Sequence, residues 1–148
     1  MIRETHLYQE IFEQPDVLAE LLESEKTTIT KLAGIISEVD PSHVVIAARG
    51  TSDNVGRYAK YLLGSVNRMN VGLATPSLYT IYKTPPLFKN ALVLGISQSG
   101  QSPDIVAVLA EAERQGAFTL GITNHLDSPL AQTVTHTIHM HAGIEKSV

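Results

Sequence analysis

Three short apolar runs alternate with helical stretches along the middle of the chain, and this alternation constrains the fold more than any other feature. The runs are Val44–Ala48, Ala91–Ile96 and Phe118–Thr123. A continuous apolar run of this length is typical of a strand covered on both faces. Between the runs, Asn54–Val66 and Pro103–Gln115 carry apolar residues at helical spacing. Buried strands alternating with helices predict a parallel sheet with right-handed crossovers, a doubly wound α/β sandwich.

Weaker patterns complete this sheet. Val71–Ala74 and Thr137–Met140 are expected to be edge strands, which gives a five-stranded parallel sheet in a flavodoxin-like, three-layer sandwich. A short helix is expected over Ser128–Thr133, and Ala74–Lys89, which is rich in proline and tyrosine, is expected to be a loop around one helical turn.

The first 40 residues are expected to form a helical arm (1–40) ahead of a ligand-binding domain (41–148). One apolar stripe ends near Gln14, and Pro15 suits the first turn of a helix, so we expect a second helix to begin there. Apolar residues at helical spacing return at Ile29–Ile36, after a polar break.

The composition limits the class of protein. A length of 148 residues fits a single domain with its own core. The net charge of −4 offers no basic field for nucleic acid, and no apolar run is long enough to cross a membrane. The absence of cysteine and the charged N-terminus without an apolar segment favour a cytoplasmic protein.

Two polar loops follow buried strands, and ligands of such sheets bind beyond the carboxyl ends of the strands. The first loop is Arg49–Asn54 and the second is Ser97–Ser102. The second loop leads into a strong helix start, with Ser102 as a hydroxyl cap and proline next. Gly100 allows the backbone to turn tightly or to approach a ligand closely.

A helix start leaves amide groups unpaired and carries a partial positive charge, so a phosphate can be bound there by amides and hydroxyls. Neither loop contains lysine, so we expect neutral donors to hold the anion, with Arg49 as the nearest cation. Serine and threonine also cap helices without any ligand, and for each loop alone that interpretation stays open. Two such loops after neighbouring strands favour an anion site.

Three histidines, His136, His139 and His141, lie close together, but nothing nearby completes a recognisable metal-ligand set. We therefore predict no metal and no cofactor.

These loops, in this order, resemble the sugar isomerase (SIS) domain family, and most of all the isomerase half of glucosamine-6-phosphate synthases (glutamine–fructose-6-phosphate aminotransferases) and the SIS-type glucosamine-6-phosphate deaminases. The similar segments cover nearly the whole chain. They are Glu10–Pro15, Ala48–Ser52, Ser97–Ser102, Gly121–Asn124 and Ala142–Val148.

The resemblance implies roles for particular residues. It implies that hydroxyl and amide side chains of both loops bind the substrate phosphate, that two glycines support the loops, and that one glutamate lies in the substrate pocket. The implied phosphate-binding residues are Thr51, Ser52, Ser97, Gln98, Ser99 and Ser102, with backbone support from Gly50 and Gly100 and a pocket position for Glu145. Gln101 stands where the synthases usually carry glutamate, and Asp53–Asn54 is closer to the deaminase-type members.

The resemblance also implies a function. We expect a phosphosugar-binding domain of an aminosugar-phosphate isomerase, aminotransferase or deaminase that acts on glucosamine 6-phosphate or fructose 6-phosphate. Family enzymes carry two such domains in tandem, so we expect residues 41–148 to be the first, the second being absent from this sequence. The family's catalytic glutamate, histidine and lysine belong to that other part, and no residue here is predicted to be catalytic. We also expect a homodimer or pairing with a second SIS domain; a non-catalytic sugar-phosphate sensor and an inactive remnant are the alternatives.

Overall fold

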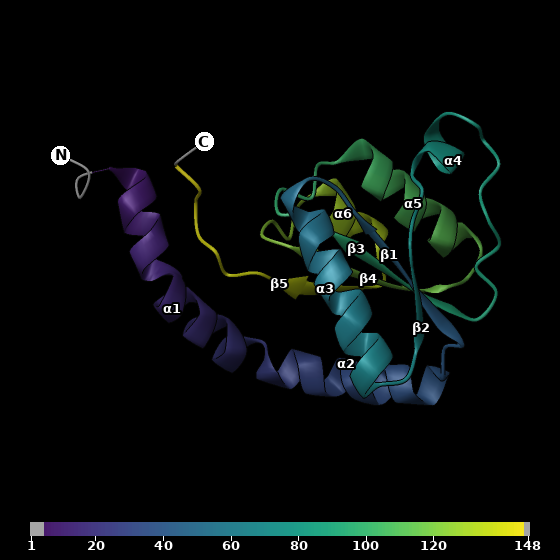
Figure 1. The fold of residues 1–148 in the computed structure, drawn as a ribbon, viewed down its shortest axis with the longest axis horizontal. Coiled ribbons are helices and arrows are strands. Elements are labelled where there is room, and N and C mark those ends of the chain that lie inside the picture. Colours follow the sequence, from purple (N-terminus) through teal and green to yellow (C-terminus); the bar gives the residue numbers. More distant parts are fainter. Residues whose placement is uncertain (1–4, 147–148) are drawn as a thin grey trace.

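The computed structural model describes residues 5–146, which form a five-stranded sheet with helices on both faces and a helical arm (Figure 1). The strands are β1 (His43–Ala48), β2 (Asn70–Leu73), β3 (Ala91–Ile96), β4 (Phe118–Thr123) and β5 (His136–His139). The helices are α1 (His6–Ser24), α2 (Lys26–Val39), α3 (Thr51–Val66), α4 (Ser77–Thr80), α5 (Pro103–Arg114) and α6 (Pro129–Thr133). Among residues 5–146, no helix is both long and apolar enough to cross a membrane.

The strands lie in the order β2-β1-β3-β4-β5, and every neighbouring pair is parallel. The predicted doubly wound α/β sheet is therefore confirmed. The two runs with the weakest apolar signal are the edge strands β2 and β5, because an edge strand is covered less completely and needs fewer apolar residues.

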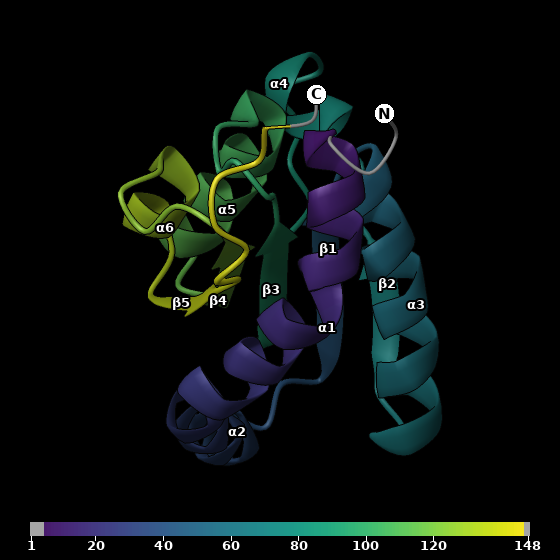
Figure 2. The ribbon, with the colours of Figure 1, turned by 90° about the vertical axis from the view of Figure 1, so that its left-hand side faces the viewer.

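Helices cover the sheet on two sides, with α2 and α3 on one face and α4, α5 and α6 on the other (Figure 2). Successive residues of a strand point to opposite faces. Thus Val44 and Ile46 of β1 pack on the α2 and α3 side, and Ala47 packs on the α5 side. All six residues of the central strand β3 are buried, as its continuous apolar run predicts.

Gly95 lets α5 and α6 lie close to the middle of β3. A Cβ atom at this position would come within 2.8 Å of Leu109 and 3.0 Å of Leu130, both of which are fully buried. A larger residue here would push α5 and α6 off the sheet, and with them the loop that precedes α5.

The arm differs from the prediction at Pro15, which lies inside α1 and does not start a helix. The break comes at Glu25, between α1 and α2, within the polar stretch that separates the two apolar stripes. A proline inside a helix leaves one carbonyl without its N–H partner. Within α1, described over its whole length, no residue is buried, so water can reach that carbonyl and the helix continues.

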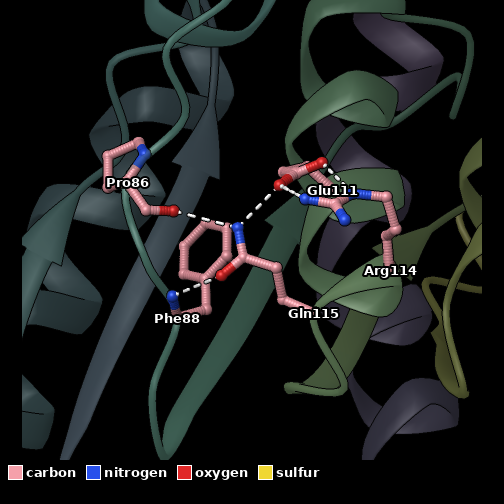
Figure 3. A network of polar contacts seen from close by, with 5 residues as sticks. All are labelled: Pro86, Phe88, Glu111, Arg114 and Gln115. Atoms are coloured by element: carbon pink, nitrogen blue, oxygen red, sulfur yellow. Dashed lines mark hydrogen bonds and ion pairs between the residues drawn. The ribbon is translucent and has the colours of Figure 1, made fainter.

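The predicted loop over 74–89 contains the single helical turn α4 and is tied to α5 by one side chain (Figure 3). Gln115 accepts a hydrogen bond from the backbone N–H of Phe88 at 2.8 Å and donates one to the carbonyl of Pro86 at 3.0 Å. Its amide also donates to Glu111, which binds Arg114 through both carboxylate oxygens. This network fixes residues 81–90, which lie between α4 and β3 and have no strand or helix.

Candidate functional site

The two polar loops lie side by side where the carboxyl ends of the strands meet. Strands β1 and β3 are hydrogen-bonded neighbours, and their last residues, Ala48 and Ile96, are paired in register. The chain therefore leaves both strands at the same level and enters α3 and α5, whose N-termini lie at this edge. The side chain of Arg49 in the first loop contacts Asp104, in the first turn of α5, at 2.9 Å.

The first loop is shorter than the sequence predicts, because α3 begins at Thr51 and not near Asn54. Thr51 and Ser52 occupy the first turn, where backbone amides have no partner within a helix. Gly50 precedes them as the N-cap with a φ of 56°, a conformation that suits glycine. This correction brings the predicted hydroxyls to the helix end itself, where the partial positive charge of the helix is concentrated.

The second loop is folded by its own serines. Ser97 is buried, and its Oγ accepts a hydrogen bond from the N–H of Gly100 at 3.1 Å. Ser99 Oγ accepts one from the N–H of Gln101 at 3.3 Å. Ser102 is the N-cap residue of α5, but its hydroxyl makes no capping hydrogen bond, contrary to the prediction, and lies 3.3 Å from the hydroxyl of Ser97. Ser99 therefore keeps its own proton for another acceptor, such as a phosphate oxygen, and so does whichever of Ser97 and Ser102 accepts the hydrogen bond between them.

Gly100 is required by the packing of this loop. Its φ is 64°, and a Cβ atom there would collide with the side chain of Ser128 and approach Thr123 Oγ1 within 2.8 Å. The carbonyl of Gly100 accepts a hydrogen bond from the N–H of Leu130 in α6. The glycine expected from the sequence to allow a tight turn therefore also lets the loop lie against the start of α6.

Each of the two helices carries an acid in its first turn, and each acid is paired with an arginine. Asp53 of α3 contacts Arg57 at 2.8 Å, and Asp104 of α5 contacts Arg49 at 2.9 Å. An unpaired carboxylate at this place would repel an anion. The pairing with arginine offsets that repulsion and leaves the helix ends favourable to negative charge.

The end of β4 supports the second loop, a role that the sequence analysis did not assign. The carbonyl of Gln98 accepts hydrogen bonds from the backbone N–H of Asn124 at 2.9 Å and from Thr123 Oγ1 at 3.2 Å. The Asn124 side chain also binds the segment after β5, through the N–H of Ala142 and the carbonyl of Gly143. The signal for this role is present in the sequence, because Asn124 directly follows a buried strand at the same edge of the sheet.

A cavity of about 230 Å³ adjoins Gln98. One wall is α1 and the other is the segment after β5, which includes the predicted pocket residue Glu145. The structure thus places Glu145 beside the loop that was predicted to bind phosphate, across the cavity from the arm.

Two of the three clustered histidines have separate partners. His139 Nε2 lies 3.1 Å from the carbonyl of Asn124, and His141 Nε2 lies 2.8 Å from Glu25. The ring of His136 is tilted by 33° against the ring of Phe118, with 5.0 Å between ring centroids, and the rings of His139 and His141 lie 4.1 Å apart. In the part of the chain that the structure describes, no three histidine, aspartate or glutamate side chains gather as metal ligands.

Relatives of known sequence align with almost the whole chain. Glutamine–fructose-6-phosphate aminotransferase (isomerizing) of Thermus thermophilus is 38% identical over 148 residues, which is 97% of this chain and 24% of that protein. The corresponding enzyme of Thermosynechococcus vestitus is 35% identical over 161 residues, covering 97% of this chain and 26% of that protein. The chain thus spans about a quarter of the length of these relatives and is homologous to their SIS half.

Solved structures share the fold. A protein of Silicibacter pomeroyi assigned as a phosphosugar isomerase superposes with a TM-score of 0.89 and 39% identity, over 93% of this chain and 42% of that chain. The C-terminal domain of glucosamine–fructose-6-phosphate aminotransferase from Francisella tularensis gives a TM-score of 0.82 and 25% identity, over 96% and 41%. The Vibrio vulnificus NanR protein, solved with ManNAc-6P, shares the fold at 20% identity and a TM-score of 0.63, over 84% and 49%.

The SIS domain family matches residues 38–148, which include both polar loops, the end of β4 and the cavity wall made by the segment after β5. The predicted resemblance is confirmed, and the chain belongs to the SIS domain family.

Proposed function

We propose that the domain binds the phosphate of a hexose phosphate at the two helix ends that follow β1 and β3. The observation that carries this proposal is the juxtaposition of the N-termini of α3 and α5, joined through Arg49 and Asp104 at 2.9 Å. A phosphate dianion placed there would accept hydrogen bonds from unpaired amides and from the hydroxyls of both loops. The proposed ligand residues are Thr51, Ser52, Ser97, Gln98, Ser99 and Ser102, with Gly50 and Gly100 as supports.

A site that holds the phosphate suits an enzyme whose reaction takes place at the sugar carbons far from the phosphate. We propose that the full activity is the interconversion of glucosamine 6-phosphate and fructose 6-phosphate, by amination or deamination. Such a reaction opens the sugar ring and moves a proton between two neighbouring carbons, so it needs an acid and a base near those carbons. The part played by the residues described here is to hold the phosphate and orient the sugar. Support comes from the 38% identity to an isomerizing aminotransferase.

A second SIS domain or a second copy of the chain is proposed as partner. The outward face of α3 carries large apolar side chains that are at least 46% exposed, namely Val55, Tyr58, Tyr61, Leu62 and Val66. An apolar stripe of this kind is typical of a surface that another protein covers. Light scattering of the purified chain tests this, since a monomer at high concentration would contradict a homodimer.

Titration calorimetry of the purified 148-residue chain with fructose 6-phosphate, glucosamine 6-phosphate and inorganic phosphate tests the proposed anchor. We expect all three to bind, because they share the phosphate. Ser99→Ala and Ser52→Ala should each weaken all three ligands by about tenfold, which is the loss expected for one hydrogen bond to a charged group. Ser65→Ala, an exposed serine near the other end of α3, is the matched control and should bind as the unchanged chain does. Equal binding by all variants would contradict the site.

A further inference from the structure

The cavity beside Gln98 has two walls that come from opposite ends of the sequence. One wall is a single face of α1, made by residues at helical spacing, and the other is the extended segment 142–145. The α1 residues at the cavity are Glu10, Glu13, Gln14 and Val17. Figures 1 and 2 both show the segment after β5 running alongside α1. The volume of about 230 Å³ is below the roughly 300–1,000 Å³ of pockets for drug-sized ligands and leaves room for the carbon skeleton of a small sugar.

The two walls are tied together at one end by Glu25 and His141. Glu25 Oε1 lies 2.8 Å from His141 Nε2, and the two residues are 116 positions apart in the sequence. Glu25 is only 8% exposed, and it is the residue at which α1 ends and α2 begins. His141 has a φ of 53°, which is uncommon for a residue other than glycine, so its surroundings hold its backbone in this conformation.

At the other end the walls meet through Glu10. Its carboxylate accepts a hydrogen bond from the backbone N–H of Lys146 at 2.7 Å. Between these two contacts, Asn124 connects the segment 142–145 to the loop Ser97–Ser102. Its side chain binds Ala142 and Gly143, and its backbone N–H binds the carbonyl of Gln98. A continuous set of polar contacts therefore runs from the loop to the junction of the arm.

Helix α1 depends on these polar contacts for its position. No residue of α1, which is described from end to end, is buried, so packing in the core does not hold it in place. The helix α2 does pack on the sheet, through Leu32 and Ile36. The position of α1 over the cavity therefore depends on the angle at Glu25 and on the polar contacts that α1 makes with the tail.

We propose that Glu25 and His141 form a clamp that holds α1 as one wall of the sugar end of the phosphosugar site. This inference rests on the proposed phosphate anchor and adds the residues that set how the rest of the ligand is held. Sugar hydroxyls would bind the carboxylates and amides of the two walls, which accept and donate hydrogen bonds. Glu25 and His141 are positioning residues: they act through α1 and do not touch the ligand.

The test compares a ligand that has a sugar with one that has none. Titration calorimetry with fructose 6-phosphate and with inorganic phosphate is carried out on the full chain, on Glu25→Ala, on His141→Ala and on the double variant. We expect each single variant to weaken fructose 6-phosphate by about fivefold or more, the lower end of typical coupling between sites, and to leave inorganic phosphate within about twofold. The double variant should be no weaker than His141→Ala, because that single substitution already removes the contact with Glu25 together with the ring contact between His141 and His139.

Two controls separate a clamp from a general loss of structure. Glu23→Ala removes an exposed carboxylate two residues earlier and should bind both ligands normally. His141→Gln can still donate a hydrogen bond to Glu25 and should recover most of the affinity for fructose 6-phosphate. If Glu25→Ala does not fold, as judged by circular dichroism, His141→Ala carries the test, because the side chain of His141 is 24% exposed and its loss disturbs the core less.

The outcomes distinguish the two proposals. If the unchanged chain binds neither ligand, the proposed anchor is wrong and the clamp falls with it. If the chain binds both ligands but the folded variants lose both equally or lose neither, the anchor stands and the clamp is wrong. Equal affinity of the unchanged chain for both ligands would also overturn the clamp, because the walls would then not contact the sugar.

Discussion

Arg49 Nη1 donates a hydrogen bond to Asp104 Oδ2 at 2.9 Å, and this pair joins the loop after β1 to the first turn of α5. The side chain of Arg49 is 70% exposed and that of Asp104 is 18% exposed. An arginine so placed has its charge largely matched by its neighbour. Its main effect on a bound anion is therefore to cancel the charge of Asp104, and the direct attraction falls to the helix ends.

Replacing Arg49 tests this interpretation. Arg49→Ala leaves the Asp104 carboxylate unpaired at the start of α5, so we expect phosphate and hexose phosphates to bind about two- to fivefold more weakly, the size of effect typical of partly exposed ion pairs. Asp104→Asn added to Arg49→Ala removes the unpaired charge and should restore the affinity. Titration calorimetry measures both. A double variant as weak as Arg49→Ala would mean that Arg49 itself contacts the phosphate.

Gly100→Ala should destabilise the protein strongly and abolish anion binding. The new Cβ atom would collide with the side chain of Ser128, so the loop must move away from α6. Residue 100 also has a φ of 64°, which strains any residue other than glycine. We expect a loss of about 2–4 kcal/mol in the free energy of unfolding, from a strained backbone and overpacking together. Urea denaturation measures this loss.

Gly116→Ala is the matched control for that substitution. Gly116 has a φ of 74° and nothing within 4 Å of the added atom, so only the backbone strain applies. Its cost should be about 1 kcal/mol, with anion binding unchanged. Equal losses in the two variants would show that the contact with Ser128 is not what requires glycine at position 100.

The strands could be predicted from the sequence because a buried parallel strand leaves a continuous apolar run, as Ala91–Ile96 does. The boundaries of helices were harder to predict. The start of α3 was placed three residues late, since Thr51 and Ser52 are typical both of loops and of a first helical turn. The prediction that a new helix begins at Pro15 was wrong. A helix tolerates an internal proline where water can bind the carbonyl that loses its N–H partner.

The site was predictable in part. The structure brings Ser52 and Ser99 to the same edge of the sheet, as the pattern of strands and loops indicated, while their role in binding stays a prediction. The contact between Glu25 and His141 could not be foreseen. It joins residues far apart in the chain and depends on a helix break and a left-handed backbone, neither of which leaves a periodic signal.

Gln115→Ala should loosen the chain between α4 and β3. Its side chain accepts the hydrogen bond of the Phe88 N–H, and Phe88 is 4% exposed (Figure 3). A backbone donor left without a partner at a mostly buried position costs about 1–3 kcal/mol of stability. Urea denaturation measures the loss, and hydrogen exchange should show faster opening near Phe88. Gln132→Ala, which removes an exposed hydrogen bond to the carbonyl of Asp127, is the control and should cost less than about 0.5 kcal/mol.

The way the free energy of unfolding changes at acid pH should depend on Glu111. Hydrogen bonds from Arg114, and then from Gln115, lower the pKa of Glu111 from 4.5 to about 2. A carboxyl whose pKa is lowered by folding stabilises the protein above its unfolded pKa, and this contribution is lost as the pH falls toward the folded value. We therefore expect Glu111→Gln to be less stable than the unchanged chain at pH 6, with the difference shrinking between pH 4.5 and pH 2. Denaturant titrations across this range measure the difference.

Arg114→Gln should make stability change less with pH over the same range, because it removes the first cause of the lowered pKa of Glu111. A difference between the unchanged chain and Glu111→Gln that stays constant from pH 6 to pH 2 would contradict the ion pair as a source of stability.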